Sequence, residues 1–137
     1  MIVAVDFGLK RIGLARSDEG EVWAFPHKTL EGGNLEAKLI EELQKLEPRL
    51  VILGLPKNMD GTEGEMASTV RSLGERLMER GFEVEFWDER LTSKLVSRQD
   101  PRSLKKAIKD KGKVDLMSAV LILQEYINAR RRTNESQ

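Results

Sequence analysis

The strongest constraint on the fold is the continuous apolar run Leu50-Val51-Ile52-Leu53-Gly54. Successive side chains of a strand point to opposite faces of its sheet, so a strand without polar residues has no side suited to water. The run is short and follows Pro48, which favours a buried strand over a helix. The chain must therefore cover both faces of the sheet that contains this strand, which predicts an α/β fold.

Helical patterns flank this run. Asn34 is a plausible N-cap for a helix that ends before Pro48, and Gly81 is suited to the C′ position of a second helix. A third helix is predicted from Val114 to about Ala129, apolar over most of its circumference. The apolar positions at helical spacing are Leu35, Leu39, Ile40, Leu43 and Leu46 in the first helix, and Met66, Val70, Leu73, Leu77 and Met78 in the second.

Four further segments have the pattern of strands. Residues 2–6, 12–15 and 22–25 are joined by short turns, which suggests an antiparallel meander, and residues 82–87 form a fifth strand. The predicted order is βββ-α-β-α-β-α. Right-handed crossovers would place the last two strands parallel to each other beside the meander. We predict a mixed five-stranded sheet with helices on its faces, with residues 1–129 as one domain and 130–137 as a flexible basic tail.

Composition excludes several kinds of site. The chain has no cysteine, hence no disulfide, thiol nucleophile or cysteine zinc site, and its single histidine, His27, makes a zinc hydrolase or a serine–histidine triad improbable. Lys plus Arg and Asp plus Glu both number 23, so only local basic patches could attract nucleic acid. The amino terminus shows no signal peptide or apolar span, which predicts a cytoplasmic protein.

Acidic residues stand where apolar patterning would not have placed them. Asp6 ends the first strand, Asp88 and Glu89 end the fifth, and Asp115 lies in the apolar final helix. Clustered carboxylates repel one another unless a cation joins them, and oxygen ligands suit Mg²⁺ or Mn²⁺. Two such ions could cleave a phosphodiester bond. Taken singly, each acid has a structural alternative, as a turn residue, a solvated strand end or a helix-dipole partner.

Basic and polar residues near these acids are candidates for substrate binding. A lysine-rich segment precedes Asp115, and two basic residues follow Asp6 in the turn after Gly8. The alternatives are solvated surface, turn chemistry around Asp60-Gly61 or simple ion pairing. We assign His27, Trp23 and Trp87 to packing. The substrate-binding candidates are Lys10, Arg11, Asn58, Arg90, Lys105, Lys106, Lys109 and Lys113.

Four segments in order resemble the YqgF/RuvX family. They span most of the chain from Ile2 to about Ile127, whereas Val96–Gly112 departs from the expected pattern and could alter substrate choice. The segments are Asp6-Phe7-Gly8-Leu9-Lys10-Arg11-Ile12-Gly13-Leu14-Ala15-Arg16-Ser17-Asp18, Gly54-Leu55-Pro56-Lys57-Asn58-Met59-Asp60-Gly61, Asp88-Glu89-Arg90-Leu91-Thr92-Ser93 and Val114-Asp115 ahead of Ser118-Ala119.

This resemblance implies a ribonuclease-H-like fold and a metal-dependent nuclease, a hydrolase acting on ester bonds. It implies Asp6, Glu89 and Asp115 as the catalytic, metal-binding set, with Asp88 as a further possible ligand, and Mg²⁺ or Mn²⁺ as cofactor, two ions with substrate bound. The expected role is 5′-end processing of pre-16S ribosomal RNA in ribosome biogenesis, with ribosomal precursor particles as partners. Cleavage of four-way DNA junctions is the alternative, and the chain could be a monomer or homodimer.

Two other functions remain open from the sequence. A nucleic-acid-binding module could retain the fold without turnover, although the complete acidic set argues against this. Asp6-Phe7-Gly8 also resembles the phosphate loop of actin-like ATPases, which generally use two such domains around the nucleotide. The chain carries no GxxxxGK[ST] signature. A nuclease is therefore the leading prediction.

Overall fold

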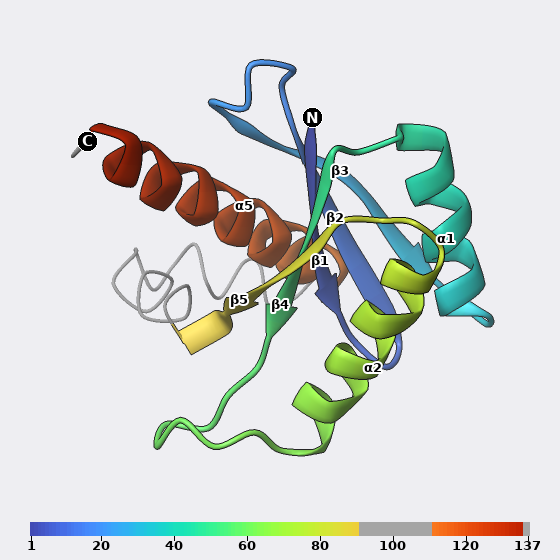
Figure 1. Ribbon diagram of the computed structural model, residues 1–137. Coiled ribbons are helices and arrows are strands. Elements are labelled where there is room, and N and C mark those ends of the chain that lie inside the picture. Colours follow the sequence, from blue (N-terminus) through green and yellow to red (C-terminus); the bar gives the residue numbers. More distant parts are fainter. Residues whose placement is uncertain (91–110, 136–137) are drawn as a thin grey trace.

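The computed structural model describes residues 1–90 and 111–135, and within this part the side chains of residues 111–115 and 134–135 are not described. A five-stranded sheet carries helices on both faces (Figure 1). The elements are β1 (Ile2–Phe7), β2 (Arg11–Ser17), β3 (Ala24–Glu31), α1 (Leu35–Leu46), β4 (Leu50–Leu55), α2 (Glu65–Glu79), β5 (Val84–Asp88) and α5 (Lys111–Glu135).

The sheet has the strand order β3-β2-β1-β4-β5. The hairpins β1–β2 and β2–β3 are antiparallel, whereas β4 lies parallel to β1, and β5 lies parallel to β4. The predicted meander with two parallel strands beside it is confirmed. This arrangement brings the carboxyl ends of β1, β4 and β5 to one edge of the sheet, where these three strands end.

Each strand near the centre contributes to two separate cores, as the apolar run predicts. Val3 and Val51 point toward α1 and α2, whereas Ala4 and Ile52 point toward α5 on the opposite face. Figure 1 shows α1 and α2 together on one side of the sheet and α5 crossing the other. Burial on both faces accounts for the absence of polar residues along β4.

The third strand differs from its predicted bounds. It begins at Ala24 and continues to Glu31, beyond the predicted end at Phe25, and it includes Pro26. Proline cannot donate a ladder hydrogen bond, and β3 tolerates it because it is an edge strand. The β2–β3 register shifts between Leu14 and Ala15, next to the residue that pairs with Pro26.

The aromatic residues and His27 do not share one role. Trp87 packs against the α5 core in a T-shaped contact with Tyr126, with ring centroids 6.1 Å apart. His27 Nε2 lies 2.8 Å from Glu42 Oε1. Trp23 is 61% exposed, so its assignment to packing is wrong. Its position just before an edge strand leaves it at the surface.

The final helix is longer than its apolar pattern indicates. Residues 130–135, predicted as part of a basic tail, continue α5 through Glu135. Arg130 there forms an ion pair with Glu21, with 3.5 Å between Nη1 and Oε1. No helix in the described ranges 1–90 and 111–135 is long and apolar enough to span a membrane.

The two predicted helix boundaries have different outcomes. Gly81 takes a left-handed conformation with φ 95° after α2, and Phe82 N donates to the Leu77 carbonyl at 3.1 Å, as in a Schellman motif. Asn34 is the N-cap residue of α1 but has φ 59° and makes no side-chain capping bond. The backbone turn from Gly32, with φ 91°, brings the chain into α1 without that bond.

Gly74 allows α2 to lie close against the sheet. A Cβ atom at this position would be 2.5 Å from Phe86 Cζ. We predict that Gly74→Ala lowers the free energy of unfolding by about 1–3 kcal/mol, despite the higher helix propensity of alanine. Gly33→Ala is the control, because a Cβ there meets no atom within 4 Å. Urea unfolding measures both; a Gly74→Ala chain as stable as wild type would contradict this packing.

Candidate active site

Asp6 lies near the end of β1 on the face of the sheet that α5 covers. Ala4, two residues earlier, belongs to the α5 core, and the alternation of a strand puts Asp6 on the same side. Asp6 pairs with Gly13 of β2. On its other side, the β1–β4 register ends at Val5 and Leu53, so Gly54 is at the next level. Asp6 thus stands between two glycines.

Glu89 reaches this place from the end of β5. A Cβ atom on Gly54 would lie 2.5 Å from Glu89 Oε1, so the Glu89 carboxyl occupies the space that the glycine leaves open. The carboxyl groups of Glu89 and Asp6 share a hydrogen bond. The predicted meeting of the β1 and β5 acids is therefore present, and it occurs across the intervening strand β4.

The electrostatics of this pair disfavour two ionised carboxylates side by side. Burial raises the pKa of Glu89 above its ordinary value, and the nearby charge of Asp88 raises it further, against an opposing contribution from the Asp6 hydrogen bond. A hydrogen bond between two carboxyl groups requires one of them to carry a proton. A divalent cation could take the place of that proton, and the oxygen-only donor set suits Mg²⁺ or Mn²⁺.

Asp115 belongs to a described helix, although its side chain is not described. It precedes Ala119 by four residues and Ile122 by seven, and both of these are buried against the sheet. Residues spaced in this way lie on one side of a helix. The Ile122 Cδ1 atom lies 2.8 Å from a Cβ built on Gly54, so this side of α5 is next to the carboxyl pair.

Asp88 has a different partner from the one expected. The Arg90 guanidinium binds both Asp88 oxygens, with 2.7 Å between Nη2 and Oδ2, and this hydrogen bond is the main cause that lowers the pKa of Asp88. The Arg90 side-chain contacts are thus with Asp88 and with the Met59 carbonyl, and its predicted role in substrate binding stays a prediction. The dipeptide Asp88-Glu89 therefore separates into an ion-paired acid and an acid in the candidate site.

The other predicted substrate-binding residues have different settings. Lys10 is exposed in the β1–β2 turn, and Arg11 Nε lies 3.2 Å from Glu31 Oε1. Gly8 closes this turn by donating to the Arg11 carbonyl at 2.9 Å, so it serves the turn itself. Lys105, Lys106 and Lys109 lie outside the described residues, as does the side chain of Lys113.

The structure adds two residues that sequence reasoning missed. Lys57, half-buried after β4, is close enough to Asp88 and Glu63 to lower the pKa values of both carboxyls. Gly54 provides the opening for Glu89. Lys57 lies within the sequence segment around Asn58, and Gly54 is the one residue of the apolar run without a side chain, so both had a signal in the sequence. Among the side chains that the structure describes, no three acids or histidines form a metal-binding group.

Comparison with known proteins assigns the family. A family model described as "RuvX: Holliday junction resolvase" matches residues 1–129. The chain belongs to the RuvX family. The resemblance inferred from the four sequence segments is therefore confirmed.

Two relatives of this chain match it over nearly the full length of both proteins. A protein of Endomicrobium trichonymphae is 39% identical over 137 residues, which cover 93% of this chain and 94% of the relative. A protein of Thermus thermophilus is 39% identical over 129 residues, which cover 90% and 94%. Both are named "Putative pre-16S rRNA nuclease". The chain is thus a member of a family of nucleases, which are hydrolases acting on ester bonds.

Solved structures confirm the ribonuclease-H-like α/β fold. RuvC of T. thermophilus, solved with a Holliday junction substrate, has a TM-score of 0.58 and 16% identity, covering 97% of this chain and 98% of RuvC. Fowlpox virus resolvase, solved with Holliday junction DNA, has a TM-score of 0.57 and 14% identity, covering 93% and 97%. At such identities the likeness concerns the fold alone.

The raised pKa of Glu89 predicts a pH-dependent stability of the metal-free protein. At pH values between the ordinary pKa of 4.5 and the higher pKa of Glu89 in the fold, the folded chain binds more protons than the unfolded chain. The free energy of unfolding therefore falls as pH rises through this interval. Glu89→Gln removes this titration. Its stability relative to wild type should therefore increase with pH, measured by urea unfolding with a chelator present. A relative stability that decreases across the same interval would contradict the carboxyl contact.

Proposed function

We propose that this RuvX-family chain is a divalent-metal-dependent nuclease that processes the 5′ end of pre-16S ribosomal RNA in the cytoplasm. The observation that carries the proposal is the contact between the Asp6 and Glu89 carboxyls over Gly54. This pair lies at the edge of the sheet where three parallel strands end. The names of the relatives support the RNA as substrate.

The residues present fit a divalent metal. Asp6 and Glu89 offer oxygen ligands in direct contact, and α5 carries Asp115 on the side that packs beside them. We assign these three acids to the metal. Mg²⁺ or Mn²⁺ bound there would lower the pKa of a water molecule and stabilise negative charge on the phosphate. The burial of Glu89 favours this exchange, because its ionised form is costly without a cation.

Basic side chains near the edge would hold the phosphates of the substrate. Lys57 lies beside Asp88 after β4, and Lys10 is exposed in the turn that follows Asp6. Arg11 and Arg90 have carboxylate partners, which suits them to fixing the backbone around the site. The lysines of residues 102–113 remain candidates for further phosphate contacts.

A Holliday junction is the second candidate substrate. The description of the matching family model, "Holliday junction resolvase", favours it. The same carboxyl pair would serve either substrate, since both reactions occur at phosphorus. Coordinated cuts on two strands would further require two active sites and therefore two copies of this chain. The oligomeric state is therefore measured together with the substrate preference.

Removal of either carboxylate should abolish cleavage. Labelled pre-16S ribosomal RNA and a four-way DNA junction are incubated with Mg²⁺, Mn²⁺ or chelator. We expect metal-dependent cutting that falls at least about 100-fold in Asp6→Asn and Glu89→Gln. Glu79→Gln, an exposed position on α2, is the control and should cut as wild type does. Binding without cutting under every condition would instead support a silent nucleic-acid-binding module.

Gly54→Ala should reduce cleavage while leaving the fold intact. The added Cβ would lie 2.5 Å from Glu89 Oε1 and 2.8 Å from Ile122 Cδ1, so the carboxyl must move. We expect about 10- to 100-fold slower metal-dependent cutting, the effect typical of a displaced metal ligand shell.

A second substitution separates the two close contacts at Gly54. Ile122→Val removes the Cδ1 atom and leaves Glu89 in place. In the Gly54→Ala, Ile122→Val double variant, part of the lost stability should return, measured by urea unfolding, but cleavage should stay slow. Wild-type cleavage in Gly54→Ala would show that Glu89 does not need the space above this residue.

A further inference from the structure

The loop between β4 and α2 contains a closely bonded turn, residues 58–62. Asn58 N donates to the Thr62 carbonyl at 2.8 Å, and Gly61 N donates to the Asn58 carbonyl at 2.9 Å. Asp60 Oδ1 accepts from Thr62 N at 2.9 Å and from Thr62 Oγ1 at 2.6 Å. Gly61 has φ 90°, a conformation that favours glycine. The 58–62 turn therefore holds its shape by its own hydrogen bonds.

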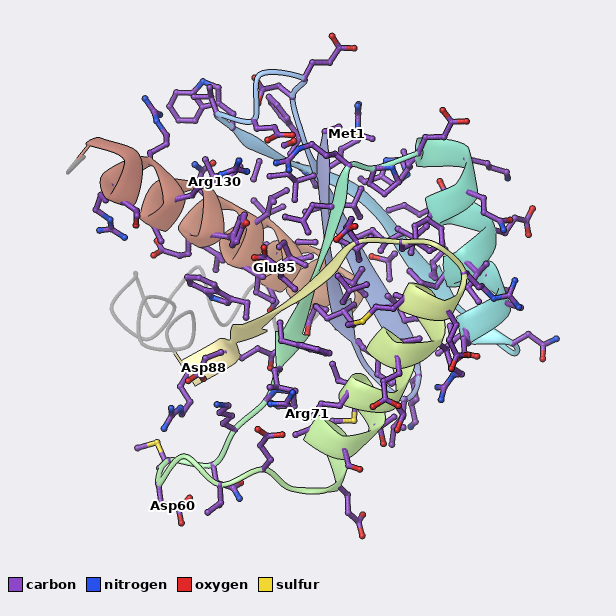
Figure 2. All side chains as sticks on the ribbon, in the orientation of Figure 1. Met1, Asp60, Arg71, Glu85, Asp88 and Arg130 are labelled. Carbon is purple, nitrogen blue, oxygen red and sulfur yellow. The ribbon has the colours of Figure 1, made fainter. Side chains whose placement is uncertain are left out.

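This turn presents an apolar side chain to water. Met59 is 93% exposed, although its own backbone is fixed within the turn. Figure 2 shows Asp60, its neighbour, at the far end of the loop that extends beyond the sheet below Asp88. Single exposed apolar residues are common on protein surfaces. Met59 differs in that its main chain is also bonded to the residue that follows Glu89.

Arg90 makes that connection. Its Nη1 donates to the Met59 carbonyl at 3.5 Å, while its Nε and Nη2 bind the Asp88 carboxylate. Arg90 directly follows Glu89 in the chain. One guanidinium thus contacts both the turn and Asp88, the neighbour of Glu89, and a single-point cation such as lysine could not make both contacts with the same geometry.

The chemistry of the turn fits one kind of ligand. Met59 supplies a polarisable thioether, which makes favourable contacts with aromatic rings. Lys57, at the start of the loop, supplies a cation near Asp88 for a phosphate. A single apolar side chain is far smaller than a protein–protein interface. A nucleobase with its adjoining phosphate matches both features, because every base has an apolar face.

We propose that Met59 contacts an unpaired nucleobase beside the cleavage site, and that Arg90 is a positioning residue that sets the separation between this base and the cut bond. The proposal rests on the proposed nuclease function and adds to it a substrate feature, an unpaired base at a fixed distance from the scissile phosphate. Apolar side chains that enter a nucleic acid in this way usually need the base to be unstacked.

Abasic substrates test the Met59 contact. Precursor RNAs that lack one base at successive positions around the cut are compared for wild type, Met59→Ser and Met59→Leu. Met78→Ser, a 44% exposed methionine on α2, is the matched control. We expect Met59→Ser to raise Kd and to lower kcat/KM about tenfold on the intact RNA. In wild type, removal of the contacted base from the RNA should have the same effect. On the RNA that lacks the contacted base, Met59→Ser should cause no further loss of binding or cleavage. Met59→Leu should retain most of the activity on the intact RNA.

Two results would overturn the contact. Met59→Ser could bind and cut the intact RNA as well as wild type, or its loss could be the same at every abasic position. Kd is measured with the metal chelated as well as with Mg²⁺. Failure of the wild type to cut would therefore count against the nuclease function alone, while the Kd comparison would still decide the Met59 contact.

The positioning role of Arg90 has its own readout. Arg90→Lys should keep a positive charge beside Asp88 but lose the simultaneous bond to the Met59 carbonyl. We expect cuts spread over neighbouring phosphodiester bonds, mapped at nucleotide resolution. A slower cut at the single wild-type bond would contradict this role, since a change in fold stability lowers the rate without changing where the RNA is cut.

Discussion

The contact between the Asp6 and Glu89 carboxyls is the constraint on which the site depends. Two acidic groups do not approach one another in a partly buried place without a force that holds them. Here that force comes from the sheet, because β1 and β5 are fixed on either side of β4 by backbone pairing. Gly54 leaves the space through which Glu89 reaches Asp6. The cost of this contact makes the pair suited to a divalent cation.

The two cores on the faces of the sheet hold the strands that carry these acids. The core under α1 and α2 includes Val5 and Leu53, and the core under α5 includes Ala4 and Ile52, so the two residues before Asp6 and the two before Gly54 are anchored. The α5 core continues into the site itself through Ile122, which lies beside Gly54. The packed core and the sheet edge that holds the carboxyl pair are therefore parts of one layer, and Asp115 lies on the helix α5 of that layer.

The charged residues at the sheet edge have separate tasks. Glu89 is half-buried and shares a hydrogen bond with Asp6, while Asp88 next to it is held by Arg90. The same arginine connects to the Met59 carbonyl, so the chain after β5 and the loop after β4 form one unit. Through Arg90, the 58–62 turn is connected to Asp88, the neighbour of Glu89 in the carboxyl pair. The three residues Asp88, Glu89 and Arg90 thus connect the carboxyl pair to the loop after β4.

The sequence by itself determined the element order, the burial of β4 on both faces and the choice of Asp6, Glu89 and Asp115 as candidates. The first two features follow from local periodicity, and the acids stand out because apolar residues would be expected at their positions. The choice of these three acids as a set is what the resemblance to the YqgF/RuvX family implies. Only the tertiary structure decided that Glu89 crosses β4 above Gly54, that Arg90 turns to Asp88 and that β3 runs on through Pro26. The position of Glu89 and the extent of β3 depend on which strands are neighbours and in what register, and local periodicity does not reveal that pairing. The Arg90–Asp88 contact is local and depends on the conformation of the chain where β5 ends.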